Sequence, residues 1–342
     1  MSRVAVIGGG SWGTALAFLL ASNAHDVNLW VYEEELVTEI REKRENTLFL
    51  PGVILPDTIH PSHSFDEVLD GPEIIVWVTP SHTIRETLTQ ARSRIRNTPI
   101  FIGASKGIEN DSLLRVSQIV DEILGRDTVR YVTLSGPTFA SEVGRKMPSS
   151  AVVAGQDEET AREVQLLLNT SWFRVYTNPD HIGVELGGAL KNIIAIAVGI
   201  TAGLKLGSNA KAALITRGLW EIARLGTAMG AKPLTFLGLS GMGDLVLTCD
   251  GTQSRNYLVG LRIGSGETLT TIQQSMRMVA EGVRTTASVS ELARKLNIEM
   301  PITDQVYEVL YHDKSPRQAL QDLMSRSLKL EHQMNYMRFE DA

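Results

Sequence analysis

The sequence of 342 residues has one cysteine and no large excess of charge of either sign. A single thiol, Cys249, excludes an internal disulfide and with it a small secreted scaffold held together by disulfides. The 33 basic and 39 acidic residues give a formal net charge of −6. Nucleic acids and anionic membranes favour basic surfaces, so we expect a cytoplasmic protein with no nucleic-acid partner.

Long, uninterrupted apolar runs are also missing. The apolar N-terminal stretch is similar to a secretion signal, but Gly8-Gly9-Gly10 and Gly13 interrupt it. The segment from Ile193 to Leu204 is apolar or small apart from Thr201, yet a membrane-spanning helix needs about 20 apolar residues. We therefore expect a buried core helix there and no membrane insertion.

The first half of the chain alternates β-branched runs with helical stretches. Single hydrophobic cores stop growing beyond roughly 250–300 residues, which predicts two domains. Continuous apolar strands separated by helices predict a mostly parallel sheet covered on both faces. From residue 182 onward the pattern is helical. We predict an α/β protein with a Rossmann-type domain over 1–180, an all-helical domain over 181–335 and a C-terminal tail over 336–342. The strands are expected at 4–7, 27–31, 74–78, 100–102, 131–134, 151–153 and 173–176, with helices at 14–22, 33–45, 83–95 and 158–168.

Polar segments follow four of the predicted strands, at the edge where ligands bind in an open parallel sheet. They are Gly8–Gly13, Thr79–Ser81, Ser105–Gly107 and Ser135–Thr138. The first reads Gly8-Gly9-Gly10-Ser11-Trp12-Gly13 and satisfies G-x-G-x-x-G between a strand and a helix. These glycines permit a tight turn, close approach of a pyrophosphate and close packing of helix on strand, which predicts a dinucleotide site.

An acidic residue about 20 positions after such a loop commonly binds the adenosine ribose. Glu33, Glu34 and Glu35 are candidates, although acidic residues in a first helical turn also stabilise the helix dipole, and we favour that second interpretation. No Arg or Lys occurs between residues 26 and 40 to bind a ribose 2′-phosphate, which favours NAD over NADP.

Lys191 is surrounded in the sequence by small and apolar residues, in Gly187-Gly188-Ala189-Leu190-Lys191-Asn192. Burial lowers the pKa of a lysine, and such an amine can exchange a proton with a carbonyl oxygen. The alternatives are a side chain that extends to the surface and a structural ion pair with Glu185.

A glycine-rich turn ends at Asp244 and is followed by Ser254-Arg255-Asn256. A hydroxyl, a guanidinium and an amide together suit a phosphate, whereas the alternative is a helix cap beside a surface arginine. No metal site is expected, because His60 and His63 lie in a proline-containing loop without further ligands. Cys249 is expected to be a buried thiol.

These motifs, in this order, resemble the NAD(P)-dependent glycerol-3-phosphate dehydrogenases of the bacterial soluble type. The resemblance covers residues 4 to about 335 and rests on Gly8–Gly13, Ser105–Ile108, Ser135–Ala140, Gly187–Asn192 and Gly241–Asn256. It implies a Rossmann domain followed by a helical domain, NADP or NAD as cofactor, and interconversion of dihydroxyacetone phosphate and glycerol 3-phosphate. Family members often carry His or Arg where this chain has Tyr32, which leaves NADP open.

The resemblance also implies roles for individual residues. Lys191 matches the proton donor and acceptor. The positions that match substrate contacts are Lys106, Gly136, Thr138, Lys191, Asp244, Ser254, Arg255 and Asn256. With the glycines Gly8, Gly10 and Gly13, the positions that match cofactor contacts are Ser11, Trp12, Tyr32, Lys106, Ala140, Arg255, Val279 and Glu281.

Two other functions remain compatible with the sequence. One is a β-hydroxyacid dehydrogenase with the same domain layout that acts on a carboxylate substrate. The other is a nicotinamide-sensing binding protein, which has no need of a lysine in an apolar helix. Large apolar helix faces in the second half also permit a homodimer.

Overall fold

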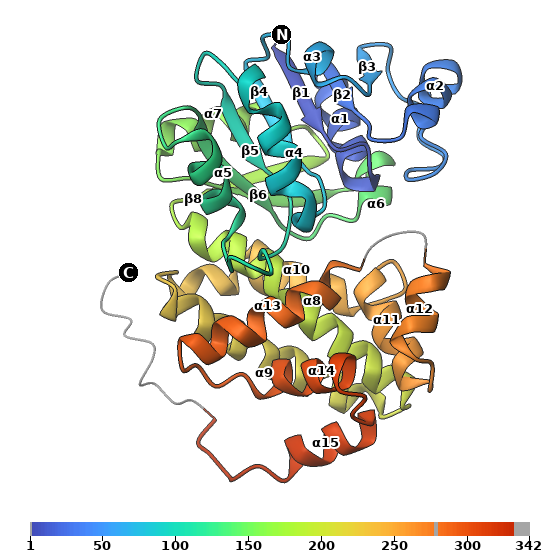
Figure 1. Cartoon of the computed structure of the whole chain (residues 1–342), viewed down its shortest axis with the longest axis vertical. Coiled ribbons are helices and arrows are strands. Elements are labelled where there is room, and N and C mark those ends of the chain that lie inside the picture. The colour runs from blue at the N-terminus through green and yellow to red at the C-terminus, as the bar shows by residue number, and fades with distance from the viewer. Residues whose placement is uncertain (1, 277–279, 332–342) are drawn as a thin grey trace. The chain divides into compact units, whose positions relative to one another are not determined.

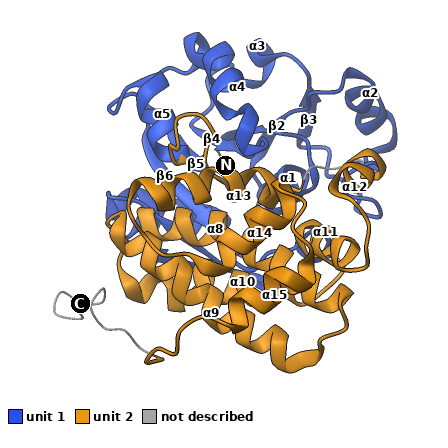
Figure 2. Ribbon diagram, turned by 60° about the horizontal axis from the view of Figure 1, so that its bottom comes forward, with its two compact units in different colours: residues 1–105, 116–181 blue, residues 106–115, 182–342 orange. Residues whose placement is uncertain are grey.

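The computed structural model describes residues 2–276 and 280–331, which fold as two compact units. Unit 1 contains the chain up to residue 105 and residues 116–181, and unit 2 contains residues 106–115 and the chain from residue 182 onward. Figure 2 colours the two units separately. The predicted boundary near residue 180 stays a prediction, and the grouping of residues 106–115 with the second unit was not predicted.

Unit 1 is built on an eight-stranded sheet of order β3-β2-β1-β4-β5-β6-β7-β8 (Figure 1). Six strands, from β3 to β6 in that order, run parallel, and β7 pairs antiparallel with β6. The strands are β1 (Arg3–Ile7), β2 (Asp26–Trp30), β3 (Ile59–Ser62), β4 (Ile74–Trp77), β5 (Ile100–Gly103), β6 (Arg130–Ser135), β7 (Ser149–Ala154) and β8 (Phe173–Asn178). The predicted mostly parallel, Rossmann-type sheet is confirmed.

The helices of unit 1 follow the apolar periodicity of the sequence. In α7, an Asp157 side chain accepts hydrogen bonds from the Glu159 and Thr160 amides and fixes the first turn. The helices are α1 (Ser11–Ser22), α2 (Glu34–Lys43), α3 (Phe65–Val68), α4 (Ile84–Ala91), α5 (Val116–Leu124), α6 (Ala140–Gly144) and α7 (Glu158–Leu168). Short 3₁₀ turns cover Ser81–Thr83 and Arg92–Arg94, where the predicted helix over 83–95 is interrupted.

Strand β3 corrects one sequence prediction. Residues 60–63 were expected to form a proline-containing loop, but Ile59–Ser62 pairs in parallel with β2. Proline lacks an N–H donor and is tolerated at the edge of a sheet, where one side of the strand needs no partner. Pro61 occupies this edge strand, and its carbonyl accepts a hydrogen bond from Arg41 Nε at 3.1 Å.

In unit 2, every described element is helical. The longest, α8 (His181–Gly203), has the length and composition to cross a membrane, but 89% of its apolar window is buried, which is typical of a core helix. The other elements are α9 (Gly207–Ala228), a 3₁₀ turn (Pro233–Leu237), a π-helical turn (Leu239–Gly243), α10 (Asp244–Cys249), α11 (Arg255–Gly264), α12 (Leu269–Ser275), α13 (Glu281–Lys295), α14 (Pro301–Tyr311) and α15 (Pro316–Met324).

Helix α8 packs very closely against α11 because glycines lie at their contact. A Cβ at Gly199 would lie 2.1 Å from the Tyr257 carbonyl oxygen, and one at Gly260 would lie 2.0 Å from that of Ile196. Real Cβ atoms do not approach so closely, so only glycine permits this separation. The close packing fixes the first turn of α11 beside the helix that contains Lys191.

Candidate active site

The loop between β1 and α1 has the geometry that a dinucleotide phosphate requires. Gly8 has φ +128°, a conformation that L side chains rarely adopt, and a Cβ at Gly13 would lie 1.8 Å from the Gly8 carbonyl oxygen. Gly10 instead borders open space, and no side chain caps the N-terminus of α1 there. A helix N-terminus of this kind binds anions through its N–H groups and dipole, so the loop fits the pyrophosphate of NAD or NADP.

Other predicted cofactor residues of unit 1 lie at the starts of α1 and α6 and just after β2. Ser11 is the first residue of α1, and the neighbouring Trp12 has a buried Nε1–H without a hydrogen-bond partner among the described residues. Tyr32 is 76% exposed just after β2. Ala140 begins α6 and packs on the core of the unit. Buried donors normally have a hydrogen-bond partner, so the unpaired indole N–H of Trp12 is available to bond to a ligand.

The acidic residues after β2 are arranged as the dipole interpretation predicts. Glu33 is the N-terminal flanking residue of α2, and Glu34 and Glu35 lie in its first turn. Their position stabilises the positive end of the helix dipole.

Gly136 and Thr138 follow β6. Gly136 has φ +135°, and a Cβ there would lie 3.0 Å from Ala151 Cα on the neighbouring strand β7. The Thr138 hydroxyl donates a hydrogen bond to the Gly136 carbonyl at 3.3 Å. Both residues therefore lie at the carboxyl end of β6, as predicted.

In unit 2, Lys191 is buried near the middle of α8 and is only 7% exposed. Its ammonium is paired with the Asp244 carboxylate and donates a hydrogen bond to Thr248 Oγ1 at 2.6 Å. The Lys191 side chain therefore does not extend to the surface. The alternative pair with Glu185 is also wrong, because that carboxylate is paired with Arg115.

Asp244 is the centre of this cluster and is 1% exposed. It is held at the first residue of α10, directly after the π-helical turn over Leu239–Gly243, a type of turn that is frequent at functional sites. Its second carboxylate oxygen is 2.6 Å from Lys106 Nζ. Two ammonium groups thus share one carboxylate, which leaves an excess of one positive charge in a buried place.

Burial determines the acidity of Lys191. The pKa of its ammonium is lowered from 10.5 to about 8, mainly by desolvation and also by the positive charge of Lys106, while Asp244 opposes both effects. A pKa near 8 means that the group can lose and regain a proton close to neutral pH. This is the property of a general acid and base.

Thr248 was missed by the sequence analysis. Its hydroxyl accepts the Lys191 hydrogen bond and donates one to the Asp244 backbone carbonyl at 2.6 Å. The signal was present, because residues i and i+4 share a face of a helix and Thr248 is four residues after Asp244.

Lys106 belongs to a segment that was expected to follow a strand at the edge of the sheet. Ser105 does follow β5, and its hydroxyl donates a hydrogen bond to the Thr79 carbonyl at 2.6 Å. Lys106 itself belongs to unit 2, where it contacts Asp244, and the nearby Ile108 and Leu113 are buried in the core of that unit.

Comparison with known proteins decides the family. The model of the NAD-dependent glycerol-3-phosphate dehydrogenase N-terminus matches residues 3–161, and that of the C-terminus matches residues 180–321. The chain belongs to the NAD-dependent glycerol-3-phosphate dehydrogenase family. The predicted family is thereby confirmed, and the protein is an oxidoreductase of the NAD(P)-dependent class.

Relatives match over almost the whole chain. A glycerol-3-phosphate dehydrogenase [NAD(P)+] from Citrifermentans bemidjiense is 53% identical over 96% of this chain and 98% of its own length. One from Bacillus thuringiensis is 49% identical over 97% of this chain and 98% of its own length. The crystal structure of glycerol-3-phosphate dehydrogenase from Coxiella burnetii has a TM-score of 0.91 at 41% identity and covers 95% of this chain and 99% of that one.

The remaining site residues of this dehydrogenase lie at the first turns of α11 and α13. Ser254 caps α11 by accepting from the Tyr257 amide at 3.2 Å, as the helix-cap alternative predicted, and Arg255 is exposed. Asn256 Oδ1 accepts from the Gly282 amide at 2.9 Å. A Cβ at Gly282 would lie 2.9 Å from the Asn192 carbonyl oxygen, so this turn lies against α8 next to Lys191.

Glu281 is the first residue of α13, directly before this contact. Val279 was predicted to contact the cofactor, and it lies outside the described residues. In unit 2 the structure therefore brings Lys106, Lys191 and Asp244 together and places Asn256 against the same stretch of α8 through Gly282.

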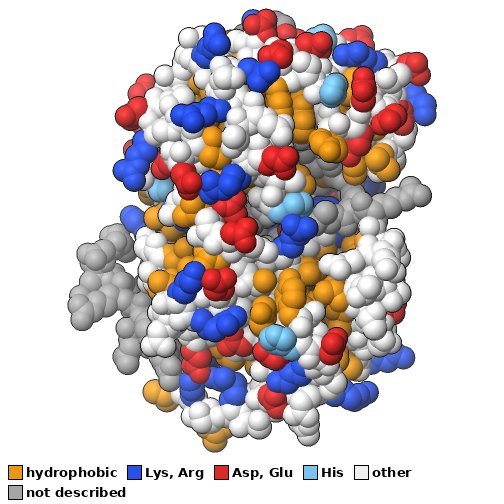
Figure 3. Space-filling view, viewed as in Figure 1, with side chains coloured by type: hydrophobic (Ala, Val, Ile, Leu, Met, Phe, Trp, Pro, Cys, Tyr) orange, Lys and Arg blue, Asp and Glu red, His pale blue; other side chains and the backbone are white. Residues whose placement is uncertain are grey.

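Other features of the chain do not converge on a site. Cys249 is fully buried, as expected, and burial raises the pKa of its thiol to about 12. Among the described residues, no group of three or more His, Cys, Asp and Glu is arranged to hold a metal ion. Figure 3 shows basic and acidic side chains interspersed on the face in view.

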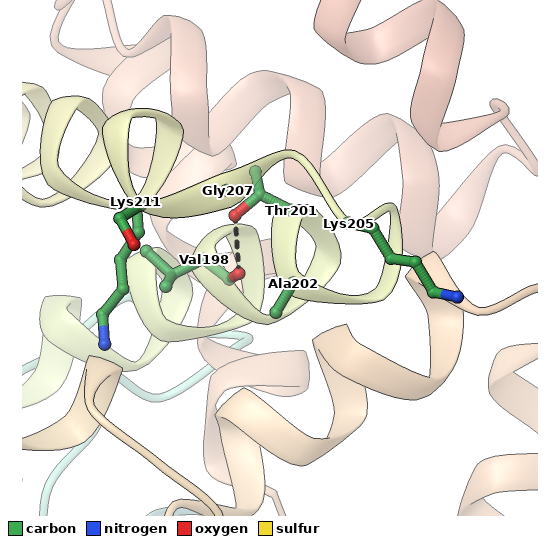
Figure 4. Close-up of a pocket in the computed structure, with 7 residues that line it drawn as sticks. Val198, Thr201, Ala202, Lys205, Gly207 and Lys211 are labelled. Atoms are coloured by element: carbon green, nitrogen blue, oxygen red, sulfur yellow. Dashed lines mark hydrogen bonds between the residues drawn. The ribbon is translucent and has the colours of Figure 1, made fainter.

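A groove of about 410 Å³ lies in unit 2 between the end of α8 and the start of α9. Lys205 and Lys211 lie at opposite ends of the residues drawn in Figure 4 and do not point toward a common centre. Lys211 is also paired with Asp250 at 2.7 Å. The groove therefore lacks the convergent cations that an anion site needs. Its lining residues are Val198, Thr201, Ala202, Lys205, Gly207, Ser208 and Lys211.

Proposed function

We propose that this protein interconverts dihydroxyacetone phosphate and sn-glycerol 3-phosphate with NADPH or NADH in the cytoplasm, and supplies glycerol 3-phosphate for phospholipid synthesis. Membership of the family supports the activity. The observation that carries the assignment of the site is the buried Lys191 ammonium, held between Asp244 and Thr248. A nicotinamide cofactor, when bound, would supply or accept the hydride, which is chemistry that no side chain provides.

Lys191 acts on the carbonyl oxygen of the substrate. In the direction of reduction, negative charge develops on this oxygen, and the ammonium stabilises the charge and gives up a proton. In the direction of oxidation, the neutral amine takes the hydroxyl proton. Asp244 and Thr248 hold the amine in one position, so that it need not reorganise during the reaction.

The phosphate of the substrate is held by Arg255, with Ser254 and Asn256 beside it. A guanidinium presents several N–H donors in a fixed fork that matches phosphate oxygens. The cap formed by Ser254 uses only an acceptor site of its hydroxyl, so its O–H can still donate. Lys106 adds a second positive charge on the side of Asp244 opposite to Lys191. Gly136 and Thr138 complete the predicted substrate contacts.

The cofactor is held by unit 1 through the loop of Gly8, Gly10 and Gly13. The open space at Gly10 and the uncapped start of α1 support this assignment. The further residues proposed to contact the cofactor are Ser11, Trp12, Tyr32, Lys106, Ala140, Arg255, Val279 and Glu281.

A steady-state comparison of NADPH and NADH with dihydroxyacetone phosphate tests the proposal. We expect turnover with dihydroxyacetone phosphate and none with hydroxyisobutyrate-type acids. Turnover only with the acids would instead establish a β-hydroxyacid dehydrogenase. A sensor without catalytic activity would bind the cofactor and turn over neither substrate.

A further inference from the structure

Residues 106–115 leave unit 1 after β5, pack with unit 2, and return to unit 1 at the start of α5. We call residues 106–115 the strap. The Glu109 amide bonds to the Leu114 carbonyl at 3.0 Å, and Ile108 and Arg115 form an isolated antiparallel bridge, so the strap doubles back on itself. Lys106 is its first residue and contacts Asp244. The position of this lysine therefore depends on what holds the strap.

The first anchor is an ion pair at the end of the strap. Arg115 is paired with Glu185 of α8, and the two side chains are only 10% and 6% exposed. Glu185 lies on the same helix as Lys191. Separating the partners of a buried ion pair leaves uncompensated charges, which is energetically costly. The pair therefore holds the end of the strap in one position on α8.

The second anchor is the hydroxyl of Ser288 on α13. It is 2.5 Å from Asn110 Oδ1 and 3.1 Å from the Ile108 carbonyl oxygen, and the residue is 1% exposed. Ser288 therefore holds the turn of the strap, while the side chains of Ile108 and Leu113 are buried in the core of unit 2. The polar and apolar contacts together leave the strap little freedom to shift along α8.

We propose that Arg115, Glu185 and Ser288 are positioning residues of the dehydrogenase, which hold the strap on unit 2 so that Lys106 stays on Asp244. The inference rests on the proposed function. These residues touch neither substrate nor cofactor, and they act through Lys106. Displacement of Lys106 changes two things at once: the charge available to the substrate and the charge next to Lys191.

The second effect provides a distinctive readout. Among the described residues, the charged and titratable groups that shift the pKa of Lys191 are Asp244 and Cys249 on α10 and Lys106 on the strap. Lys106 lowers the pKa of Lys191, so its displacement raises that pKa. The pH at which reduction slows should therefore move upward in a strap variant, as it should in Lys106→Met.

The experiment compares full-length Arg115→Met, Arg115→Lys and Ser288→Ala with the unaltered enzyme. Arg130→Met is the control, because Arg130 pairs with Glu163 in unit 1, where the two side chains are 42% and 44% exposed. We expect kcat/KM for dihydroxyacetone phosphate to fall about tenfold or more in Arg115→Met and less in Ser288→Ala, with partial recovery in Arg115→Lys. The control should keep its activity.

Two further measurements separate positioning from folding. The cofactor should still bind, as followed by tryptophan fluorescence, because the glycine loop of unit 1 is unaltered, and the alkaline midpoint of kcat/KM should shift upward in Ser288→Ala and Arg115→Met. Variants that lose thermal stability but keep the kcat/KM and the midpoint of the unaltered enzyme would overturn the inference. An unaltered enzyme that does not turn over dihydroxyacetone phosphate would overturn the proposed function instead.

Discussion

At the scale of residues, the main feature of the site in unit 2 is that it holds charged groups away from water. One carboxylate, Asp244, lies between two ammonium groups, of Lys106 and Lys191. Desolvation alone would penalise the Lys191 ammonium heavily, and the ion pair with Asp244 limits that penalty. The balance leaves an amine that is protonated at neutral pH and still able to give up its proton.

Replacement of Lys191 by alanine tests its role directly. We expect turnover to fall by about a hundred- to ten-thousand-fold, because both the acid and the charge that stabilises the substrate oxygen are lost. Cofactor binding should be retained, as measured by a fluorescence titration. Lys205→Ala is the control, since this exposed lysine lies just after the same helix. Equal turnover in the two variants would refute the role.

The pH dependence of the two directions should be opposite. Reduction needs the Lys191 ammonium, so its rate should fall as pH rises through about 8. Oxidation needs the neutral amine, so its rate should increase through the same range. Initial rates measured from pH 6.5 to 9.5 in one mixed buffer provide the test, and profiles that change in the same direction would contradict the assignment.

At the scale of elements, the sequence predicted the sheet well because buried parallel strands are continuous apolar runs. It predicted the glycine loop because the glycines of this motif have separate roles: the tight turn at Gly8, open space for a ligand at Gly10 and close packing at Gly13. It did not predict β3, because Pro61 made this edge strand resemble a loop. It also did not predict the strap, because the residues that contact residues 108–115 lie far away in the chain.

Polar contacts between distant helices were likewise beyond the sequence. The buried Glu221 of α9 accepts hydrogen bonds from the Ile302 and Thr303 amides at 2.6 and 3.1 Å, so the carboxylate that caps α14 comes from another helix. Helix caps are predictable only when the capping side chain is local. The same limit explains why the sequence singled out Lys191 but left open an ion pair with Glu185.

The glycine loop yields a prediction with two matched variants. Gly13→Ala places a Cβ 1.8 Å from the Gly8 carbonyl oxygen, so α1 must move away from β1. We expect a lower melting temperature and weaker cofactor binding. Gly10→Ala meets open space at φ −73°, so stability should be kept while the cofactor binds less tightly.

Thermal denaturation without ligand and a cofactor titration separate the two effects. If Gly10→Ala binds the cofactor as tightly as the unaltered protein, the loop does not contact the phosphates. If Gly13→Ala retains its melting temperature, the close packing of α1 on β1 is not a requirement of the fold.

At the scale of the whole molecule, a protein of net charge −6 binds anionic ligands. Charges more than a Debye length away, about 8 Å at physiological ionic strength, are largely screened. The three cations proposed to bind the substrate should therefore outweigh the more distant excess of carboxylates; they are Lys106, Lys191 and Arg255. The total charge describes solubility, whereas the local arrangement determines ligand binding.

This balance predicts the effect of salt. Raising the ionic strength should lower kcat/KM for dihydroxyacetone phosphate, since salt screens the attraction between the phosphate and nearby cations. The measurement is a series of initial rates at increasing sodium chloride and constant pH. An increase of kcat/KM with salt would show that repulsion by the net negative charge dominates.

The buried thiol of Cys249 has a practical consequence. It is the only cysteine of the chain and directly follows Thr248, the partner of Lys191. A thiol that is fully buried, with a pKa raised to about 12, is almost inert toward alkylating reagents. The rate at which Cys249 is alkylated therefore reports how often α10 opens. The measurement needs no introduced label, and no other thiol of the chain competes for the reagent.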